Sequence, residues 1–147
     1  MDTIRDPGNL GTILRIADWF GLDAVFAAKD TEDVFNPKVV QATMGAVFRV
    51  KMHYVDLPSL AKIVLASGGK LYGTFLDGED MYGKDLQNNG IIVMGNEGNG
   101  IGAGCAAHVT ERIFIPNYPA ERATSESLNV SMATAIICSE FRRRARR

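Results

Sequence analysis

The feature that most constrains the fold is an alternation of short apolar runs with segments of helical periodicity along the whole chain. In the first helical segment, Leu10, Ile13, Leu14 and Ala17 recur at the spacing of one helix face. Strands that alternate with helices predict a mostly parallel sheet with helices on both faces, an α/β fold. The expected strands are 24–28, 50–55, 70–76, 91–94 and 112–115.

Turn and cap residues set the expected helix boundaries. Asn36 and Pro37 form a cap followed by a first-turn proline, and the helix that they start is expected to reach about Gly45. The polar segments 77–89 and 117–126 predict loops. The other expected helices are the one after the 6–9 turn, which ends at Gly21, and those at 58–66, 103–108 and 128–141.

Length and composition fit one globular domain over residues 1–147, with 46% hydrophobic and 22% charged residues. No apolar run approaches the roughly 20 residues of a membrane helix, and no secretory signal is present, so we expect a cytoplasmic protein. Only Thr3 and Ile4 stand before the first turn as a stunted strand. We therefore expect the chain to be cut from a longer parent.

The cysteines and histidines do not form a metal-binding pattern. Cys105 and Cys138 lack metal-like spacing and are interpreted as small core residues of a protein from a reducing compartment. His53 and His108 stand apart from other ligand-type residues. We expect no metal.

The net charge of −1 conceals an uneven distribution. The C-terminal run Arg142, Arg143, Arg144, Arg146 and Arg147 holds five of the sixteen basic residues, which leaves 11 basic and 17 acidic residues elsewhere. An acidic body is a poor general surface for a polyanion, so any nucleic-acid contact must be local. The arginine run itself fits either a solvated helix end or a phosphate contact.

A glycine-rich segment follows the expected strand at 91–94, where ligands bind in open parallel sheets. Residues 95–100 read Gly-Asn-Glu-Gly-Asn-Gly, and their exposed backbone N–H groups could bind a ligand or simply form a tight turn. Residues 98–103 formally match a dinucleotide fingerprint, but no acidic ribose partner lies at the usual distance, Glu121 being the nearest. A P-loop is excluded because no Lys-Ser or Lys-Thr follows.

Two further segments carry polar residues in apolar surroundings. Ser127 has the position of a helix N-cap, whereas Asn129 and Ser131 interrupt an otherwise apolar helix and suggest a hydrogen-bond network or a site. Arg15 lies among apolar neighbours and fits either a side chain that extends to solvent from the helix edge or a clamp for phosphate or substrate.

Together the three segments resemble the motifs of the SpoU (TrmH-type) branch of the SPOUT RNA methyltransferases. The first motif is Asp-Pro-Gly-Asn-Leu-Gly-Thr-Ile-Leu-Arg at 6–15, and the second is Val-Met-Gly-Asn-Glu-Gly-Asn-Gly-Ile at 93–101. The third combines Ile-Phe-Ile-Pro at 113–116 with Ser-Leu-Asn-Val-Ser-Met-Ala at 127–133. Their order and spacing agree along nearly the whole chain.

The resemblance implies a trefoil knot in the C-terminal half, a homodimer with the active site at the subunit interface, and S-adenosylmethionine bound in the knot without a metal. The expected reaction is methylation of a ribose 2′-hydroxyl in ribosomal or transfer RNA, with ribosomal RNA favoured. Cofactor contacts are expected mainly from the backbone. The residues expected to provide them are Thr74, Phe75, Leu76, Gly95, Asn96, Gly98, Ile115 and Leu128.

The resemblance also assigns catalytic residues. A guanidinium normally stays charged, so we expect Arg15 to orient the hydroxyl and an adjacent phosphate and to pass the proton onward, rather than to act as a simple base. Asn9, Glu97, Ser127 and Asn129 are expected to hold Arg15 and the ribose in place, with Asn129 orienting the acceptor hydroxyl. The identity of the proton acceptor stays open.

Many members of the family carry an N-terminal RNA-binding domain, which is expected to be absent or removed here. We therefore expect this chain to bind cofactor but to methylate RNA slowly. Two alternatives remain: a nicotinamide-dependent oxidoreductase built on the glycine segment, and a non-catalytic RNA-binding module.

Overall fold

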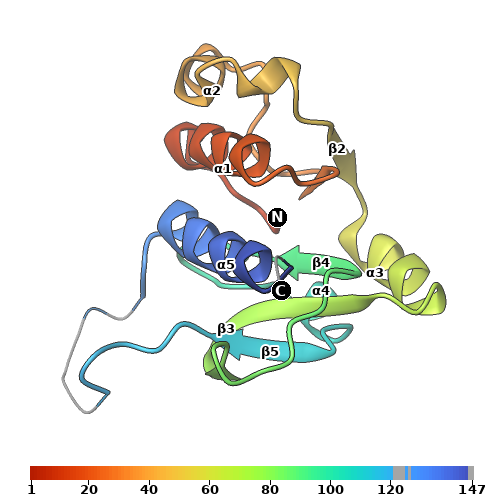
Figure 1. Ribbon diagram of the computed structural model, residues 1–147. Helices are drawn as coiled ribbons and strands as arrows, with labels where there is room; N and C mark the ends of the chain where they lie inside the picture. The colour runs from red at the N-terminus through yellow and green to blue at the C-terminus, as the bar shows by residue number, and fades with distance from the viewer. Residues whose placement is uncertain (121–124, 126, 146–147) are drawn as a thin grey trace.

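The computed structural model describes residues 1–120, 125 and 127–145, and its helices and strands alternate as the sequence predicts (Figure 1). The last part of the expected loop at 117–126 and Arg146 and Arg147 therefore fall largely outside the described residues. In chain order, the elements are α1 (Pro7–Trp19), β1 (Val25–Ala28), α2 (Pro37–Thr43), the 3₁₀ helix η1 (Ala46–Phe48), β2 (Met52–Val55), α3 (Leu57–Ala66), β3 (Lys70–Asp80), β4 (Gly90–Val93), α4 (Ala103–Ala106), β5 (Glu111–Phe114) and α5 (Val130–Ala145).

Local chemistry explains where the first helices begin and end. The Asp6 carboxylate accepts a hydrogen bond from the Asn9 backbone N–H at 2.7 Å and caps α1, and Asn36 caps α2 in the same way. A proline occupies the first turn of each helix. Gly21 has a φ of +58° just after α1, a backbone conformation that favours glycine at a helix end. These predicted boundaries are confirmed.

All strand pairings among the described residues are parallel, in two sheets with the orders β1-β2 and β4-β3-β5. Residues 1–4 connect the sheets. The Ala28 N–H donates to the Met1 carbonyl at 3.0 Å, and the Asp2 N–H donates to the Met94 carbonyl at 2.9 Å. The predicted stunted first strand is therefore a short connection between β1 and the end of β4.

Several predicted boundaries are wrong. The last helix was expected at 128–141, but α5 spans Val130–Ala145 and so continues one turn further. β3 continues through Asp80, although 77–89 was expected to be a loop; its pairing with β5 shifts, so that Thr74 and Glu79 both lie opposite Ile113. Pairing of the backbone with β5 thus extends β3 over polar residues that were expected to form a loop. α2 ends at Thr43 rather than near Gly45, because Met44 and Gly45 both have positive φ.

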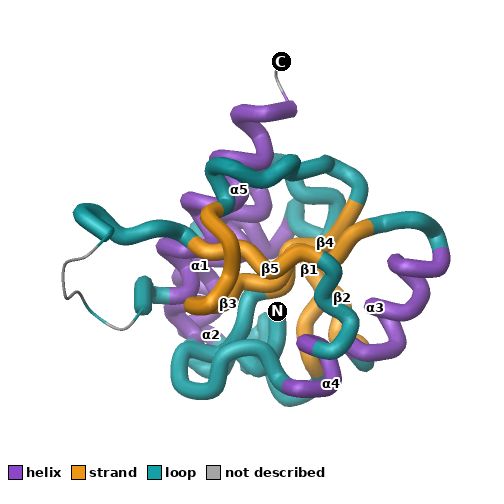
Figure 2. The backbone as a smooth tube through the Cα atoms, turned by 90° about the horizontal axis from the view of Figure 1, so that it is seen from below, coloured by secondary structure: helices purple, strands orange, loops and turns teal. Residues whose placement is uncertain are grey.

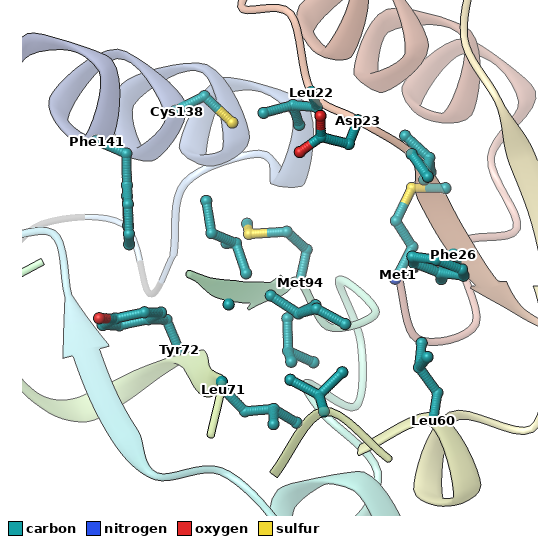
Figure 3. A pocket seen from close by; sticks show the side chains of 18 of the residues that line it. Met1, Leu22, Asp23, Phe26, Leu60, Leu71, Tyr72, Met94, Cys138 and Phe141 are labelled. Carbon is teal, nitrogen blue, oxygen red and sulfur yellow. Dashed lines mark hydrogen bonds between the residues drawn. The ribbon is translucent and has the colours of Figure 1, made fainter. Parts of the chain in front are cut away.

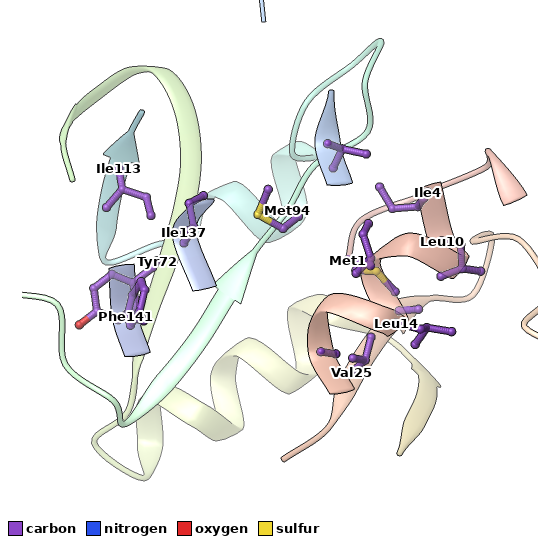
Figure 4. Packing of buried hydrophobic residues seen from close by; sticks show 14 of the residues in the cluster. Met1, Ile4, Leu10, Leu14, Val25, Tyr72, Met94, Ile113, Ile137 and Phe141 are labelled. Carbon is purple, nitrogen blue, oxygen red and sulfur yellow. The ribbon is translucent and has the colours of Figure 1, made fainter. Parts of the chain in front are cut away.

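Helices cover both faces of the strands, as predicted. In Figure 2, α1, α2 and α5 lie to one side of the strands and α3 lies to the other. Consecutive residues of β3 point to opposite faces: Tyr72 packs in the core formed with α1 and α5, and Leu71 packs in the core formed with α3 and α4. The Tyr72 ring meets the Phe141 ring of α5 edge-on, with the ring centroids 4.9 Å apart (Figure 4).

An apolar cavity of about 550 Å³ lies between β1, β4, α3 and α5, at the amino ends of the strands (Figure 3). Cys105 and Cys138 are free thiols that line it, and burial raises the pKa of Cys138 to about 11. Their interpretation as core residues is confirmed. The cavity lining includes none of the predicted site residues, which lie towards the carboxyl ends of the strands.

The described arginines of the C-terminal run hold the end of α5 to the rest of the chain. The Arg142 guanidinium donates to the carbonyls of Phe20 and Gly21 at 2.6 and 2.5 Å. Arg144 donates to the carbonyls of Met81, Tyr82 and Lys84. Neither the solvated helix end nor the phosphate contact describes Arg142 and Arg144, because both guanidinium groups are bonded to carbonyls of this chain.

No helix in the described ranges is both long and apolar enough to span a membrane. Within the same residues, no cluster of His, Cys, Asp and Glu side chains could hold a metal ion.

Candidate active site

Three side chains from the three sequence motifs meet in one hydrogen-bonded network. Asn9 lies in the first turn of α1, Glu97 in the turn after β4, and Asn129 directly before α5. The Asn9 amide donates to Glu97 Oε1 at 2.7 Å. The Asn129 amide donates to the same oxygen at 2.9 Å and to Asn9 Oδ1 at 3.0 Å. The predicted association of these three residues is thus present in the fold.

Asn129 caps α5, a role that the sequence suggested for Ser127. Its Oδ1 accepts the backbone N–H groups of Ser131 at 3.0 Å and Met132 at 3.3 Å. Asn129 therefore precedes the helix and is exposed instead of interrupting it. Ser127 lies two residues earlier and is also exposed.

Ser131 fixes which way the Asn129 amide faces. Its buried hydroxyl donates to Asn129 Oδ1 at 2.6 Å, so three donors converge on that oxygen. The opposite orientation of the amide would place N–H groups against these donors. Asn129 Nδ2 must therefore face Asn9 and Glu97. In the structure, both Nδ2 hydrogens are used in this network, so the expected contact with a ribose hydroxyl requires exchange of one of these bonds.

Glu97 differs from its two partners because part of it is unused. The side chain is exposed, and Oε1 accepts both amide bonds. No hydrogen bond or ion pair within the described ranges reaches Oε2. The network therefore holds a carboxylate at the surface with one oxygen open to a ligand.

Arg15 does not join this network. It lies six residues after Asn9 on α1, which places it about 120° away around the helix axis. It is exposed and makes no hydrogen bond or ion pair with the residues that the structure describes. Of the two interpretations of Arg15, the structure of this chain shows the side chain that extends to solvent. A role as a clamp would need a ligand or a second subunit that reaches Arg15.

The glycine segment forms a closed turn. Asn96 and Gly100 exchange backbone hydrogen bonds at 2.9 and 2.8 Å, and a Cβ on Gly95 would lie 2.3 Å from the Gly100 carbonyl carbon. Asn96 donates to the Thr3 carbonyl at 2.6 Å and accepts from the Gly98 N–H at 2.7 Å. Gly95 is thus required by the turn itself, and the Asn96 side chain and the Gly98 N–H are already bonded within the protein.

The turn is a poor match for a dinucleotide fingerprint. That motif needs its glycines at the start of a helix that can face a pyrophosphate. The helix that follows here, α4, has four residues. The geometry gives this alternative no support.

The remaining predicted cofactor residues lie along one edge of the sheet β4-β3-β5. Thr74 to Leu76 lie in β3, Gly95 follows β4 by two residues, and Ile115 follows β5 directly. Thr74 Oγ1 is 3.4 Å from the Val93 carbonyl, which places β3 and the end of β4 side by side. Leu128, near the start of α5, is half-exposed. Backbone and apolar groups in the middle of β3 and at the ends of β4 and β5 fit a nucleoside-type ligand that is held mainly by backbone contacts.

Sequence reasoning missed one residue at this edge. The Arg112 guanidinium lies 3.5 Å from the centroid of the Phe75 ring and also pairs with Asp77. This arginine lowers the pKa of the Asp77 carboxyl. Arg112 and Phe75 come from neighbouring strands, and only the strand register, in which Arg112 lies opposite Gly73, could have indicated the contact.

Comparison with known proteins identifies the family of this chain. Residues 1–139 match the model of the SpoU rRNA Methylase family. The chain is 36% identical over 143 residues to the 23S rRNA (guanosine(2553)-2′-O)-methyltransferase RlmP of Bacillus subtilis, a match that covers 97% of the chain and 56% of that protein. The chain spans about half the length of the curated relatives that it matches.

Solved structures give the same result. A TrmH-family protein from Porphyromonas gingivalis superposes with a TM-score of 0.89 and 46% identity, over 97% of this chain and 57% of that one. The AdoMet-bound rRNA methyltransferase from Sinorhizobium meliloti superposes with a TM-score of 0.88 and 33% identity, over 97% and 54% of the two chains. The trefoil knot stays a prediction. On the match over residues 1–139, this chain belongs to the SpoU rRNA methylase family.

Proposed function

We propose that the chain forms the catalytic part of an RNA methyltransferase that uses S-adenosylmethionine to methylate a ribose 2′-hydroxyl. The observation that carries this proposal is the network of Asn9, Glu97 and Asn129, which draws one polar residue from each family motif to one edge of the sheet. A protein that only bound RNA would not need a surface carboxylate held by two amides. The names of the relatives favour ribosomal RNA as the substrate.

The cofactor is proposed to lie at the carboxyl ends of β4 and β5, beside the middle of β3. Backbone groups of Thr74 to Leu76, Gly95, Ile115 and Leu128 would hold it, with Asn96 and Gly98 acting through the shape of the turn rather than by new bonds. When bound, S-adenosylmethionine supplies a methyl group already activated on a sulfonium. The chain then only has to bind, orient and deprotonate the ribose hydroxyl.

The nucleophile needs orientation, because a ribose hydroxyl is a weak nucleophile near neutral pH. The Asn9–Glu97–Asn129 network presents fixed polar atoms for this purpose. Correct placement alone can lower a barrier by several kcal/mol. The Arg15 guanidinium would hold an RNA phosphate next to the reacting ribose.

We further propose that the protein acts as a homodimer in which Arg15 serves the partner's site. Two observations support this: Arg15 points to solvent away from Asn9, and Leu128 and Met132 on either side of Asn129 are 50% and 63% exposed. Large apolar side chains beside a polar site favour a protein contact there.

Mixing two variants tests the shared site. Arg15→Ala and Asn129→Ala are each expected to be nearly inactive. In an equal mixture, exchange of subunits makes about half of the dimers heterodimers, and each heterodimer has one intact site of two. The mixture is therefore expected to regain roughly a quarter of the wild-type activity. Methyl incorporation into RNA after subunit exchange measures this. A mixture as inactive as its components would place both residues in the same subunit's site.

Transfer of a labelled methyl group tests the function. In vitro transcribed 23S rRNA, which lacks modifications, is incubated with the protein and S-adenosyl-[methyl-³H]methionine, and the modified nucleotide is mapped by its resistance to alkaline hydrolysis. We expect label at one ribose 2′-oxygen, and transcribed tRNA is the comparison substrate. Label on a base, or binding of NAD without binding of S-adenosylhomocysteine, would contradict the proposal.

A further inference from the structure

We propose that Glu97 is the proton acceptor of the reaction and that its free oxygen, Oε2, takes the proton of the ribose hydroxyl. This inference rests on the proposed methyltransferase function. It replaces the expectation that Arg15 passes the proton onward, and it gives the Asn9 and Asn129 amides the role of anchoring a base.

The two carboxylate oxygens of Glu97 have different surroundings. Oε1 accepts the amide N–H groups of Asn9 and Asn129 at 2.7 and 2.9 Å. Oε2 has no partner in the part of the chain that the structure describes, and the side chain is exposed. One oxygen thus fixes the position of the group, and the other is left to accept a hydrogen bond from a ligand.

The other groups of the network cannot take a proton. Asn9 Oδ1 already accepts from Asn129, and Asn129 Oδ1 accepts from Ser131 and Met132. Both side chains are neutral amides. A guanidinium has donors only, so Arg15 could bind phosphate but could not accept the proton while charged. Glu97 is the member of the network that can be a base.

The step balances in atoms and charge. The hydroxyl proton passes to Glu97 Oε2 as the hydroxyl oxygen forms its bond to the methyl carbon. The carbon–sulfur bond of the donor breaks, and its electron pair stays on sulfur. The negative charge of Glu97 and the positive charge of the sulfonium are both lost, so no charge separation develops between them.

The principal test is Glu97→Gln. The amide oxygen can still accept from Asn9 and Asn129, so the network is kept, but the second position now carries an N–H donor. The rate of a single turnover on 23S rRNA should fall at least about 100-fold, as expected for the loss of a general base. The affinity for S-adenosylhomocysteine and the melting temperature should stay at wild-type values. Asp23→Asn is the matched control and should keep the wild-type rate, because this exposed carboxylate precedes β1 and lines the cavity at the amino ends of the strands.

Chemical rescue separates a base from an anchor. Glu97→Ala leaves space for a small carboxylate, so 100 mM formate should raise its rate at least about tenfold over the same concentration of chloride. A base replaced from solution produces this gain, whereas a lost anchor does not. A rate that is insensitive to formate, or a Glu97→Gln rate within threefold of wild type, would overturn the proposal.

A binding measurement gives a readout independent of turnover. RNA oligonucleotides spanning the mapped nucleotide are compared with a 2′-hydroxyl or a 2′-deoxy group at that position, in the presence of S-adenosylhomocysteine. The wild type should bind the hydroxyl form about fivefold or more tightly, and Glu97→Ala should lose this preference. Equal preference in both proteins would contradict a bond to Glu97. If the wild type transfers no methyl to RNA, the proposed function itself fails, which is a separate outcome.

Discussion

Ser131 shows how one buried hydroxyl can control a surface site. Its Oγ lies 2.6 Å from Asn129 Oδ1 and is screened from solvent, whereas the amide that it orients is exposed. Without the hydroxyl, the amide would keep the two backbone N–H donors but lose the shortest of its three contacts. Ser131 therefore acts on the site through Asn129 and is a positioning residue.

Ser131→Ala is expected to lower turnover about tenfold, which corresponds to roughly 1.4 kcal/mol of lost orientation in the transition state. Loss of one hydrogen bond should also reduce the free energy of unfolding by about 1 kcal/mol. Single-turnover methylation and urea unfolding measure the two effects.

Two further variants separate positioning from stability. Ser131→Thr keeps the hydroxyl and should restore most of the rate. Ser139→Ala, which removes an exposed hydroxyl from the same helix, should change neither quantity. Wild-type turnover of Ser131→Ala would contradict the positioning role.

At the residue scale, the sequence predicted which residues belong to the site better than it predicted the contacts that they make. Asn9, Glu97 and Asn129 were predicted from the motifs, and they do meet. The cap role was assigned to Ser127 instead of Asn129, because both residue types favour that position and only the start of α5 at Val130 distinguishes them. The separation of Arg15 from the network follows from helix geometry and could have been anticipated.

The last turn of α5 carries a buried carboxylate among arginines. Glu140 is 6% exposed, and its oxygens accept from Arg143 Nε and Nη2 and from Arg144 Nε, each at 2.7 Å. The hydrogen bonds from Arg143 are the largest cause of a decrease in the pKa of Glu140 from 4.5 to about 2, and those from Arg144 add to it against the opposing effect of burial. The ionised carboxylate thus holds Arg143 and Arg144 within α5, and Arg144 in turn joins the helix to the carbonyls of Met81 and Tyr82.

This pairing predicts a pH dependence of stability. Because the pKa of Glu140 is lower in the folded than in the unfolded state, its contribution is complete above about pH 4.5 and is lost as the pH falls towards 2. Glu140→Gln should reduce the free energy of unfolding by about 2 kcal/mol at pH 7, and the difference from wild type should shrink towards pH 2.5. Urea unfolding at pH 7, 4 and 2.5 measures both proteins.

The control for this effect is Glu79→Gln, which removes a carboxylate whose side chain is 78% exposed and whose partner is Lys84. The Glu79 carboxylate is solvated and Lys84 keeps its second partner, Glu111, at 3.1 Å, so this variant should stay close to wild type at each pH. A constant difference between Glu140→Gln and wild type across the pH range would show that Glu140 acts through packing alone.

At the scale of elements, apolar periodicity predicted the number and order of the strands and α-helices among the described residues, because each element buries one face, but it did not predict the 3₁₀ helix η1. Boundaries failed where backbone geometry decides them. The extension of β3 to Asp80 depends on a shift in its register with β5, and the end of α2 depends on positive φ at Met44 and Gly45. Neither the register shift nor the positive φ angles are reflected in the pattern of apolar residues.

The whole molecule depends on how its two sheets are joined. The sequence predicted a single mostly parallel sheet, and each sheet is parallel, but β1 and β4 are bridged by residues 1–4 rather than paired with each other. Hydropathy could not predict this bridge, because four residues are too short for a periodic pattern. Through Asn96, which donates to the Thr3 carbonyl, the bridge also supports the turn that carries Glu97.

Asp2 is where this connection can be tested, because its backbone N–H bonds to the Met94 carbonyl at 2.9 Å and its carboxylate accepts the Gly102 N–H at 2.6 Å. Asp2→Pro removes the backbone donor, whereas Asp2→Ala keeps it and removes only the carboxylate. If the backbone bond holds the sheets together, Asp2→Pro should loosen the neighbouring bond from the Ala28 N–H to the Met1 carbonyl. Hydrogen exchange of the Ala28 amide should then become at least about tenfold faster in Asp2→Pro. In Asp2→Ala, the exchange rate of this amide should change less than about threefold. The Glu97 turn should open with it, so methyl transfer should fall in parallel with the loss of protection in Asp2→Pro. Equal exchange of the Ala28 amide in both variants and wild type would mean that side-chain packing, and not the four-residue bridge, joins the two sheets and supports the site.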